Sequence, residues 1–128
     1  MQILQPPGWA RAKGFANGIA CKGTLVFIAG QIGWTGEGRW EASDFAGQFR
    51  QALKNILAVL AEAKGKPEHI VRLTWYVLDK QEYLGALQEV GAAYRELVGR
   101  NYPAMSVVVV AGLLEPRAKV EIEATAVI

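Results

Sequence analysis

The stretch AKVEIEATAVI, residues 118–128, decides the fold class, because apolar and polar side chains alternate along most of its length. Val120, Ile122, Ala124 and Ala126 fall on one face, and Lys119, Glu121, Glu123 and Thr125 fall on the other. A repeat of two residues is typical of a β-strand that buries one of its faces. The chain must therefore supply further strands beside this one and a layer that covers its apolar face.

Three other segments have the β-branched and aromatic composition of strands. They are residues 24–32 (TLVFIAGQI), 70–78 (IVRLTWYVL) and 105–111 (MSVVVVA), and residues 14–21 (GFANGIAC) are a shorter candidate. The N-terminal stretch to about residue 13 contains two prolines and a glycine, so we expect a loop or arm there. Residues 33–44 are rich in glycine and predict a loop.

Two segments have the 3.6-residue period of amphipathic helices. The first is capped by Ser43 or Asp44, is ended by Gly65, and has one face formed by Phe45, Phe49, Leu53, Ile56 and Leu60. The second runs from about Lys80 to Val98 and is weakened by two glycines, and its apolar face is formed by Leu84, Leu87, Val90, Tyr94 and Leu97. The order β-β-α-β-α-β-β predicts a single α+β domain over residues 1–128, with two helices on one face of a sheet.

The run of four valines from Val107 to Val110 puts apolar side chains on both faces of its strand. The two helices cover only one of these faces, and the chain has no further element to cover the other. Self-association is therefore expected, with the sheets of several copies packed around a shared centre.

Composition excludes several classes of site. A single cysteine, Cys21, and a single histidine, His69, rule out an internal disulfide, a zinc cluster and a Ser-His-Asp triad within one chain. We expect Cys21 to be buried or half-buried, and His69 to be a surface or capping residue. The net charge of +2 comes from scattered basic residues, which disfavours nucleic-acid binding.

Nothing in the sequence predicts contact with a membrane. No apolar run approaches the roughly 18–20 residues that span a bilayer. The first fifteen residues have no apolar stretch after a basic one, so no signal peptide is expected and a cytoplasmic location is predicted.

Five segments, in this order, resemble the YjgF/RidA family, and together they span nearly the whole chain. They are residues 25–32 (LVFIAGQI), 48–63 (QFRQALKNILAVLAEA), 70–79 (IVRLT and VLD), 102–104 (YPA) and 120–124 (VEIEA). The resemblance implies a chorismate-mutase-like fold, a homotrimer, and clefts between subunits that bind small carboxylate-bearing molecules. Members of the deaminase type hydrolyse reactive enamines and imines without metal or cofactor.

The resemblance also implies roles for three residues of this cleft. Glu121 stands at the glutamate that positions the attacking water, although its place in the alternating strand also fits a solvent-facing residue. The backbone around Gly30 lines the cleft, since glycine permits close approach of a ligand. Gln31 either hydrogen-bonds the ligand or caps the strand ends.

Three further positions make the expected cleft more apolar than the family pattern. The resemblance implies an arginine after Pro-Ala that grips the substrate carboxylate with parallel N–H donors, and this position is Met105. Phe15 stands at a tyrosine and Val107 at a cysteine. A thioether cannot replace a guanidinium as a carboxylate clamp, and a methionine also serves as a core or interface filler.

Four other residues leave alternatives open. Arg72 and Arg117 either bring a cation to the cleft or are solvated. Trp34 and Trp40, in the Gly-rich loop, either close over a ligand or are buried at a subunit contact.

Four hypotheses follow from these observations. The first is a small-molecule-binding protein with clefts between subunits and a ligand that lacks the carboxylate or is held by another cation. The second is an enamine/imine deaminase of the 2-iminopropanoate/2-aminoacrylate type that uses Glu121. An RNA- or translation-directed role would need a basic groove, and a scaffold without ligand would have a closed, dry cleft.

Overall fold

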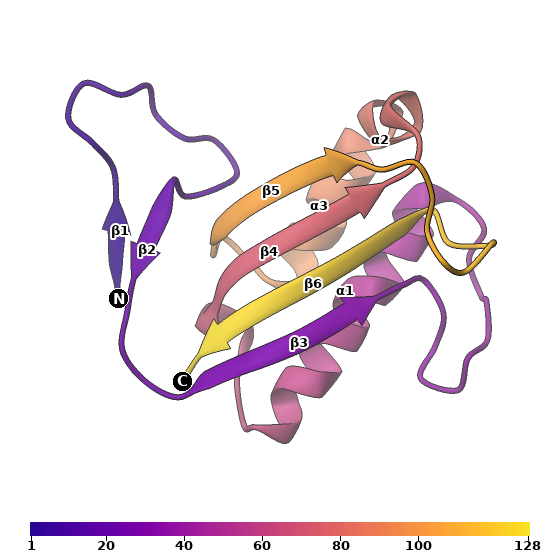
Figure 1. Ribbon diagram of the computed structural model, residues 1–128, viewed down its shortest axis with the longest axis horizontal. Coiled ribbons are helices and arrows are strands. Elements are labelled where there is room, and N and C mark those ends of the chain that lie inside the picture. Colours follow the sequence, from indigo (N-terminus) through magenta and orange to yellow (C-terminus); the bar gives the residue numbers. More distant parts are fainter.

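The computed structural model describes residues 1–128 and contains a four-stranded mixed sheet (Figure 1). Its strands lie in the order β3 (Leu25–Gln31), β6 (Val120–Val127), β4 (Ile70–Val77) and β5 (Ala104–Val109). β6 pairs antiparallel with both β3 and β4, and β4 pairs parallel with β5. The alternating C-terminal segment is thus a central strand, and the predicted α+β class is confirmed.

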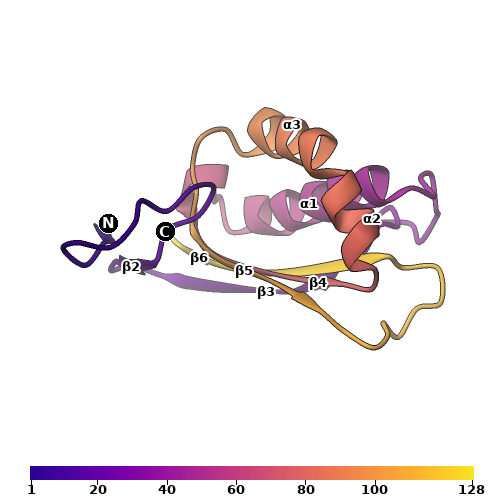
Figure 2. The same cartoon turned by 90° about the horizontal axis from the view of Figure 1, so that it is seen from above.

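Three helices lie on one face of this sheet (Figure 2). They are α1 (Phe45–Glu62), α2 (Lys80–Gly85) and α3 (Leu87–Leu97), and a short 3-10 helix, η1 (Pro67–His69), precedes β4. α2 and α3 form the crossover that parallel strands such as β4 and β5 require. His69 accepts a hydrogen bond on Nδ1 from the backbone N–H of Lys66 (2.8 Å), so its predicted capping role is confirmed.

The prediction of one helix from Lys80 to Val98 is wrong, because the chain breaks at Ala86. There φ is −108° and ψ is 8°, and the Ala86 N–H bonds to the Tyr83 carbonyl in a tight turn. Gly85, at the end of α2, has low helix propensity and permits this break. As a result Leu84 and Leu87, expected on a buried face, are 44% and 47% exposed.

The N-terminal residues form a separate hairpin. β1 (Gln2–Leu4) pairs antiparallel with β2 (Gly18–Ala20), so the predicted loop contains a strand, and the predicted strand 14–21 does not join the main sheet. Only Ala16 bridges to the edge strand β5, at Ala104. Cys21 follows β2 outside the core and is exposed, which makes its predicted burial wrong.

The core lies between α1 and the helix-facing side of the sheet. The predicted faces of α1 and β6 are both buried, and they meet Leu73, Trp75 and Val77 of β4. Phe49 and Trp75 pack with their ring centroids 4.7 Å apart. Burial of these apolar surfaces is the main stabilising term and fixes the position of β4 against the helices.

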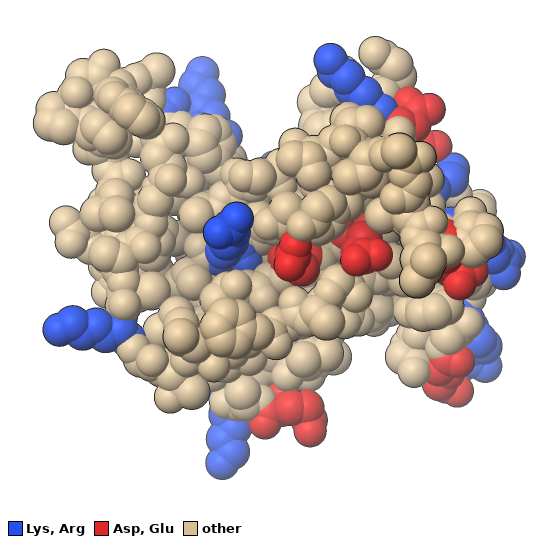
Figure 3. All heavy atoms as spheres, viewed as in Figure 1, with Lys and Arg blue, Asp and Glu red and all other residues tan.

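The other side of the sheet, which we call the open face, is uncovered and is seen in Figure 3. Phe27 is 75% exposed and Val108 is 41% exposed. Arg72, Tyr76 and Glu123 line a polar hollow between these apolar residues. The predicted absence of a cover for this face is confirmed within one chain.

Candidate functional site

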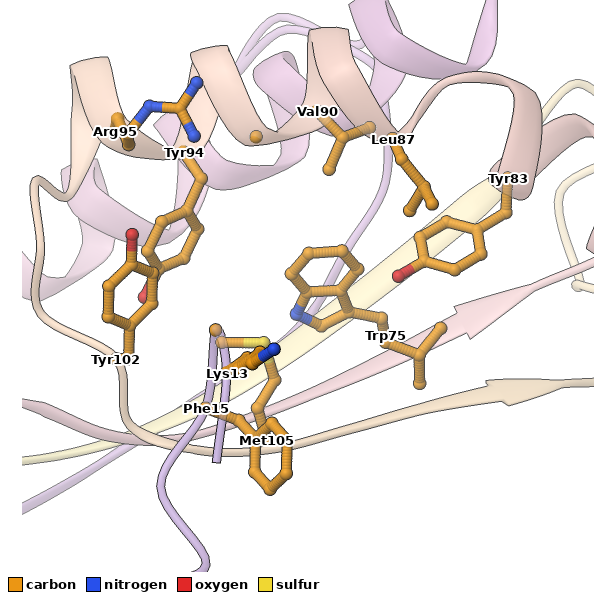
Figure 4. A pocket seen from close by; sticks show the side chains of 13 residues that line it. Lys13, Phe15, Trp75, Tyr83, Leu87, Val90, Tyr94, Arg95, Tyr102 and Met105 are labelled. Carbon is orange, nitrogen blue, oxygen red and sulfur yellow. The ribbon is translucent and has the colours of Figure 1, made fainter. Parts of the chain in front are cut away.

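A cavity of about 440 Å³ lies between α3 and the edge of the sheet (Figure 4). In the parallel pair of β4 and β5, Leu73 is opposite Met105 and Trp75 is opposite Val107, so all four face the helices. α3 supplies the opposing wall, and the loop between β1 and β2 supplies Phe15. The cavity is lined by Lys13, Gly14, Phe15, Trp75, Tyr83, Leu87, Val90, Gly91, Tyr94, Arg95, Tyr102, Met105 and Val107.

Five of the thirteen lining residues are aromatic. Trp75 and Tyr83 meet edge to face with centroids 6.2 Å apart, and Tyr94 stacks on Tyr102 at 5.6 Å. The Tyr94 hydroxyl donates to the Asn101 carbonyl at 2.5 Å. Burial raises the pKa values of Tyr83 and Tyr94, so both phenols stay neutral at physiological pH. The aromatic wall of the cavity therefore offers only neutral hydrogen-bonding groups.

The cations of the cavity are not those that the sequence suggested. Arg117 lies with its guanidinium carbon 5.7 Å from the centroid of the Trp40 ring, and Arg72 lies on the open face. Lys13 and Arg95 instead line the cavity. Sequence reasoning missed both, and the only signal was that Arg95 directly follows Tyr94 on the apolar face of a helix.

Glu121 and Gly30 lie together on the open face, in a second hollow of about 350 Å³. A Cβ atom at Gly30 would lie 2.8 Å from Cδ and 2.9 Å from Cγ of Glu121, so the glutamate occupies the space that glycine leaves. Tyr76 donates its hydroxyl to Glu123, and this hydrogen bond raises the Tyr76 pKa. Glu121 is half-buried and makes no hydrogen bond or ion pair, which leaves its carboxylate free for water.

Gln31 lies in neither hollow. Its side-chain amide donates to the Ala29 carbonyl at 3.1 Å, and it lines a shallow depression beside Trp34. Trp34 packs against Trp40 with centroids 5.9 Å apart.

Within one chain, the six candidate residues thus lie in three separate places. Phe15, Met105 and Val107 share the cavity, Gly30 and Glu121 share the open face, and Gln31 is separate. No cluster of His, Cys, Asp and Glu that could hold a metal ion is present. None of the helices is long and apolar enough to cross a membrane.

Comparison with known proteins places this fold in a family. The protein-family model described as "Endoribonuclease L-PSP" matches residues 9–128. The chain belongs to this family, the YjgF/RidA family. The crystal structure of the Rid-family protein YyfB from Yersinia pestis superposes with a TM-score of 0.86 and 28% identity, over 99% of this chain and 98% of that chain.

Two curated relatives cover most of this YjgF/RidA chain. A RutC family protein of Haemophilus influenzae is 33% identical over 105 residues, which are 82% of this chain and 80% of that protein. The 2-iminobutanoate/2-iminopropanoate deaminase of Salmonella typhimurium is 34% identical over 105 residues, with the same coverage. The predicted family and the predicted YjgF-type fold are therefore confirmed.

Proposed function

We propose that this YjgF/RidA protein binds small molecules with an apolar body, in clefts between the subunits of a homotrimer, and hydrolyses small imino acids poorly. The observation that carries the proposal is Met105 in the floor of an aromatic cavity, where the family resemblance implies a carboxylate-binding arginine. An apolar lining favours apolar ligands, and a neutral thioether leaves a carboxylate without a partner at that position.

The open face supports the trimer. Exposed apolar residues there, including Phe27 and Val108, need a cover that one chain does not supply. A neighbouring copy would also bring a second set of residues to the cavity, whose wall includes the edge strand β5. In this arrangement the free carboxylate of Glu121 in one subunit completes the cavity of the next. Sedimentation equilibrium at micromolar concentration should give three times the chain mass of 13.9 kDa, and a stable monomer would refute the arrangement.

Hydrolysis of C=N bonds is the second candidate function, and the unpaired carboxylate of Glu121 favours it. Such a group can hold and orient a water for attack on an imine carbon. The deaminase name of the Salmonella relative supports this chemistry for the family. Action on RNA is suggested by the description of the matching family model, but the net charge of only +2 and the mostly apolar cavity disfavour it for this chain.

A thermal-shift screen tests the proposal. A ligand that binds only the folded protein raises its apparent stability by mass action. Neutral ketones with a branched or aromatic body should raise the unfolding temperature, and pyruvate and 2-oxobutanoate should do so only weakly. If carboxylates alone stabilise the protein, and neutral analogues never do, the proposal is wrong.

A further inference from the structure

Trp75 carries the one buried side-chain polar atom of the chain without a hydrogen-bond partner. The residue is only 5% exposed, and its indole Nε1 has no acceptor although the ring lines the cavity. Buried N–H groups are normally paired, because an unpaired one loses its hydrogen bonds to water without replacement. A donor in this state favours a ligand that places an acceptor atom against it.

Two cations at the same cavity also lack partners. Arg95 makes no ion pair. The neighbouring carboxylate, Glu96, is paired with Arg50 instead. A Cβ atom on Gly91, one turn earlier, would lie 3.2 Å from Nη1 of Arg95, so the guanidinium lies along the helix on the cavity side. Lys13 comes from the N-terminal segment across from α3 and is likewise free of ion pairs (Figure 4).

We infer that Lys13 and Arg95 bind the anionic group of the ligand, and that the preferred ligand is a carboxylate with an aromatic body and a carbonyl group. This inference rests on the proposed function and names the ligand class of the same cavity. The aromatic body packs among Tyr83, Tyr94 and Trp75, and the carbonyl oxygen accepts from Trp75 Nε1 after the side chains that cover this buried atom move aside. The carboxylate stays at the rim, where the exposed Lys13 and Arg95 supply positive charge from opposite sides and where it keeps part of its hydration.

A carboxylate bound at the rim avoids the cost of burying its charge in the apolar part of the cavity. A carboxylate at Met105 would lose water and gain no charged partner, which is unfavourable by several kcal/mol. At the exposed rim the loss of hydration is smaller, and a guanidinium offers parallel donors to both carboxylate oxygens. The size of the cavity, about 440 Å³, leaves room for an aromatic ring that a short oxo acid lacks.

Four ligands separate these contributions. 4-Phenyl-2-oxobutanoate has the ring, the ketone and the carboxylate. 4-Phenylbutan-2-one lacks the carboxylate, 4-phenylbutanoate lacks the ketone, and 2-oxobutanoate lacks the ring. Isothermal titration of the full chain should rank 4-phenyl-2-oxobutanoate tightest and 2-oxobutanoate weakest.

Variants then assign each contribution to a residue. Arg95→Gln and Lys13→Gln should each weaken 4-phenyl-2-oxobutanoate about two- to fivefold, the range for exposed ion pairs, and leave 4-phenylbutan-2-one unchanged. Trp75→Phe should weaken the two phenyl ketones about three- to tenfold more than it weakens 4-phenylbutanoate, which loses only ring contacts. Arg100→Gln, which removes the same charge outside the cavity, is the matched control and should change none of them.

The outcomes distinguish this inference from the function on which it rests. If the phenyl ligands bind but Arg95→Gln and Lys13→Gln leave the preference for the carboxylate unchanged, the inference is overturned and the apolar cavity stands. If Trp75→Phe weakens all three phenyl ligands equally, the indole N–H has no role as donor. If none of the four ligands binds, both the inference and the proposed function are wrong.

Discussion

Replacing Gln48 by Leu should destabilise the protein strongly, because Gln48 ties α1 to the segment that leads into β6. This side chain is only 2% exposed. Its Nε2 donates to the Arg117 carbonyl at 3.0 Å, and its Oε1 accepts from the Lys119 N–H at 2.8 Å. The two backbone groups stand just before Glu121, so the same contacts hold the start of that strand in place.

The size of the effect follows from the groups left behind. Leucine fills a similar volume but pairs with neither backbone group. A buried group left without its partner costs about 1–3 kcal/mol, so two such groups give a loss of about 2–6 kcal/mol in the free energy of unfolding. Water that enters the gap would place the result at the lower end.

Urea unfolding followed by far-UV circular dichroism measures this loss, with all samples at one protein concentration so that association contributes equally. The matched control is Gln51→Leu on the same helix, where the side-chain amide donates to Asn55 at 2.9 Å and the site is half-buried. The control should cost less than about 1 kcal/mol. Equal urea midpoints of unfolding for Gln48→Leu and Gln51→Leu would refute the role given to Gln48.

Two further predictions concern the site. Gly30→Ala should force the Glu121 carboxyl group to move, since the new methyl would overlap it. The free energy of unfolding in urea should change by less than about 1 kcal/mol. An unmoved Glu121 in a crystal structure of the variant would contradict the expected overlap. Tyr94→Phe should lower stability by about 1 kcal/mol at pH 7 through loss of the hydrogen bond to Asn101. Burial raises the folded-state pKa of Tyr94 above its unfolded value of about 10. The stability that the neutral phenol contributes to the wild type is therefore fully present below pH 10, and it is lost as the pH rises through the folded-state pKa. The gap between wild type and variant should therefore narrow above pH 10, and a constant gap up to pH 11 would contradict the effect of burial.

The sheet and α1 were predictable because their signals are periodic and local. Each of these elements shows one apolar face in its sequence, by alternation along 118–128 and by the stripe from Phe45 to Leu60. In the structure these two faces are buried against each other. The break at Ala86 was not predictable, since Gly85 weakens a helix without showing whether the chain turns there. The exposure of Cys21 follows from hairpin pairing between β1 and β2, which short segments do not specify.

The candidate site was predictable only in part. The apolar members Phe15, Met105 and Val107 do meet in one cavity. The cations could not be found from sequence, because the position of Arg95 depends on the rotation of α3 and that of Lys13 on the path of the N-terminal segment. Glu121 lies on the other face of the sheet, since neighbouring strand residues alternate in direction.

On the proposed function, this protein positions small imino acids poorly because residue 105 is methionine. The direct test is to generate the imino acid in place with an amino-acid oxidase or a threonine dehydratase and to follow formation of the keto acid. Wild type should barely exceed the uncatalysed rate, since loss of substrate positioning removes a large part of the possible acceleration. Met105→Arg should restore part of the activity, and the further change Glu121→Ala should abolish it. Rapid turnover by wild type that disappears on Glu121→Ala alone would contradict the claim and establish the deaminase function.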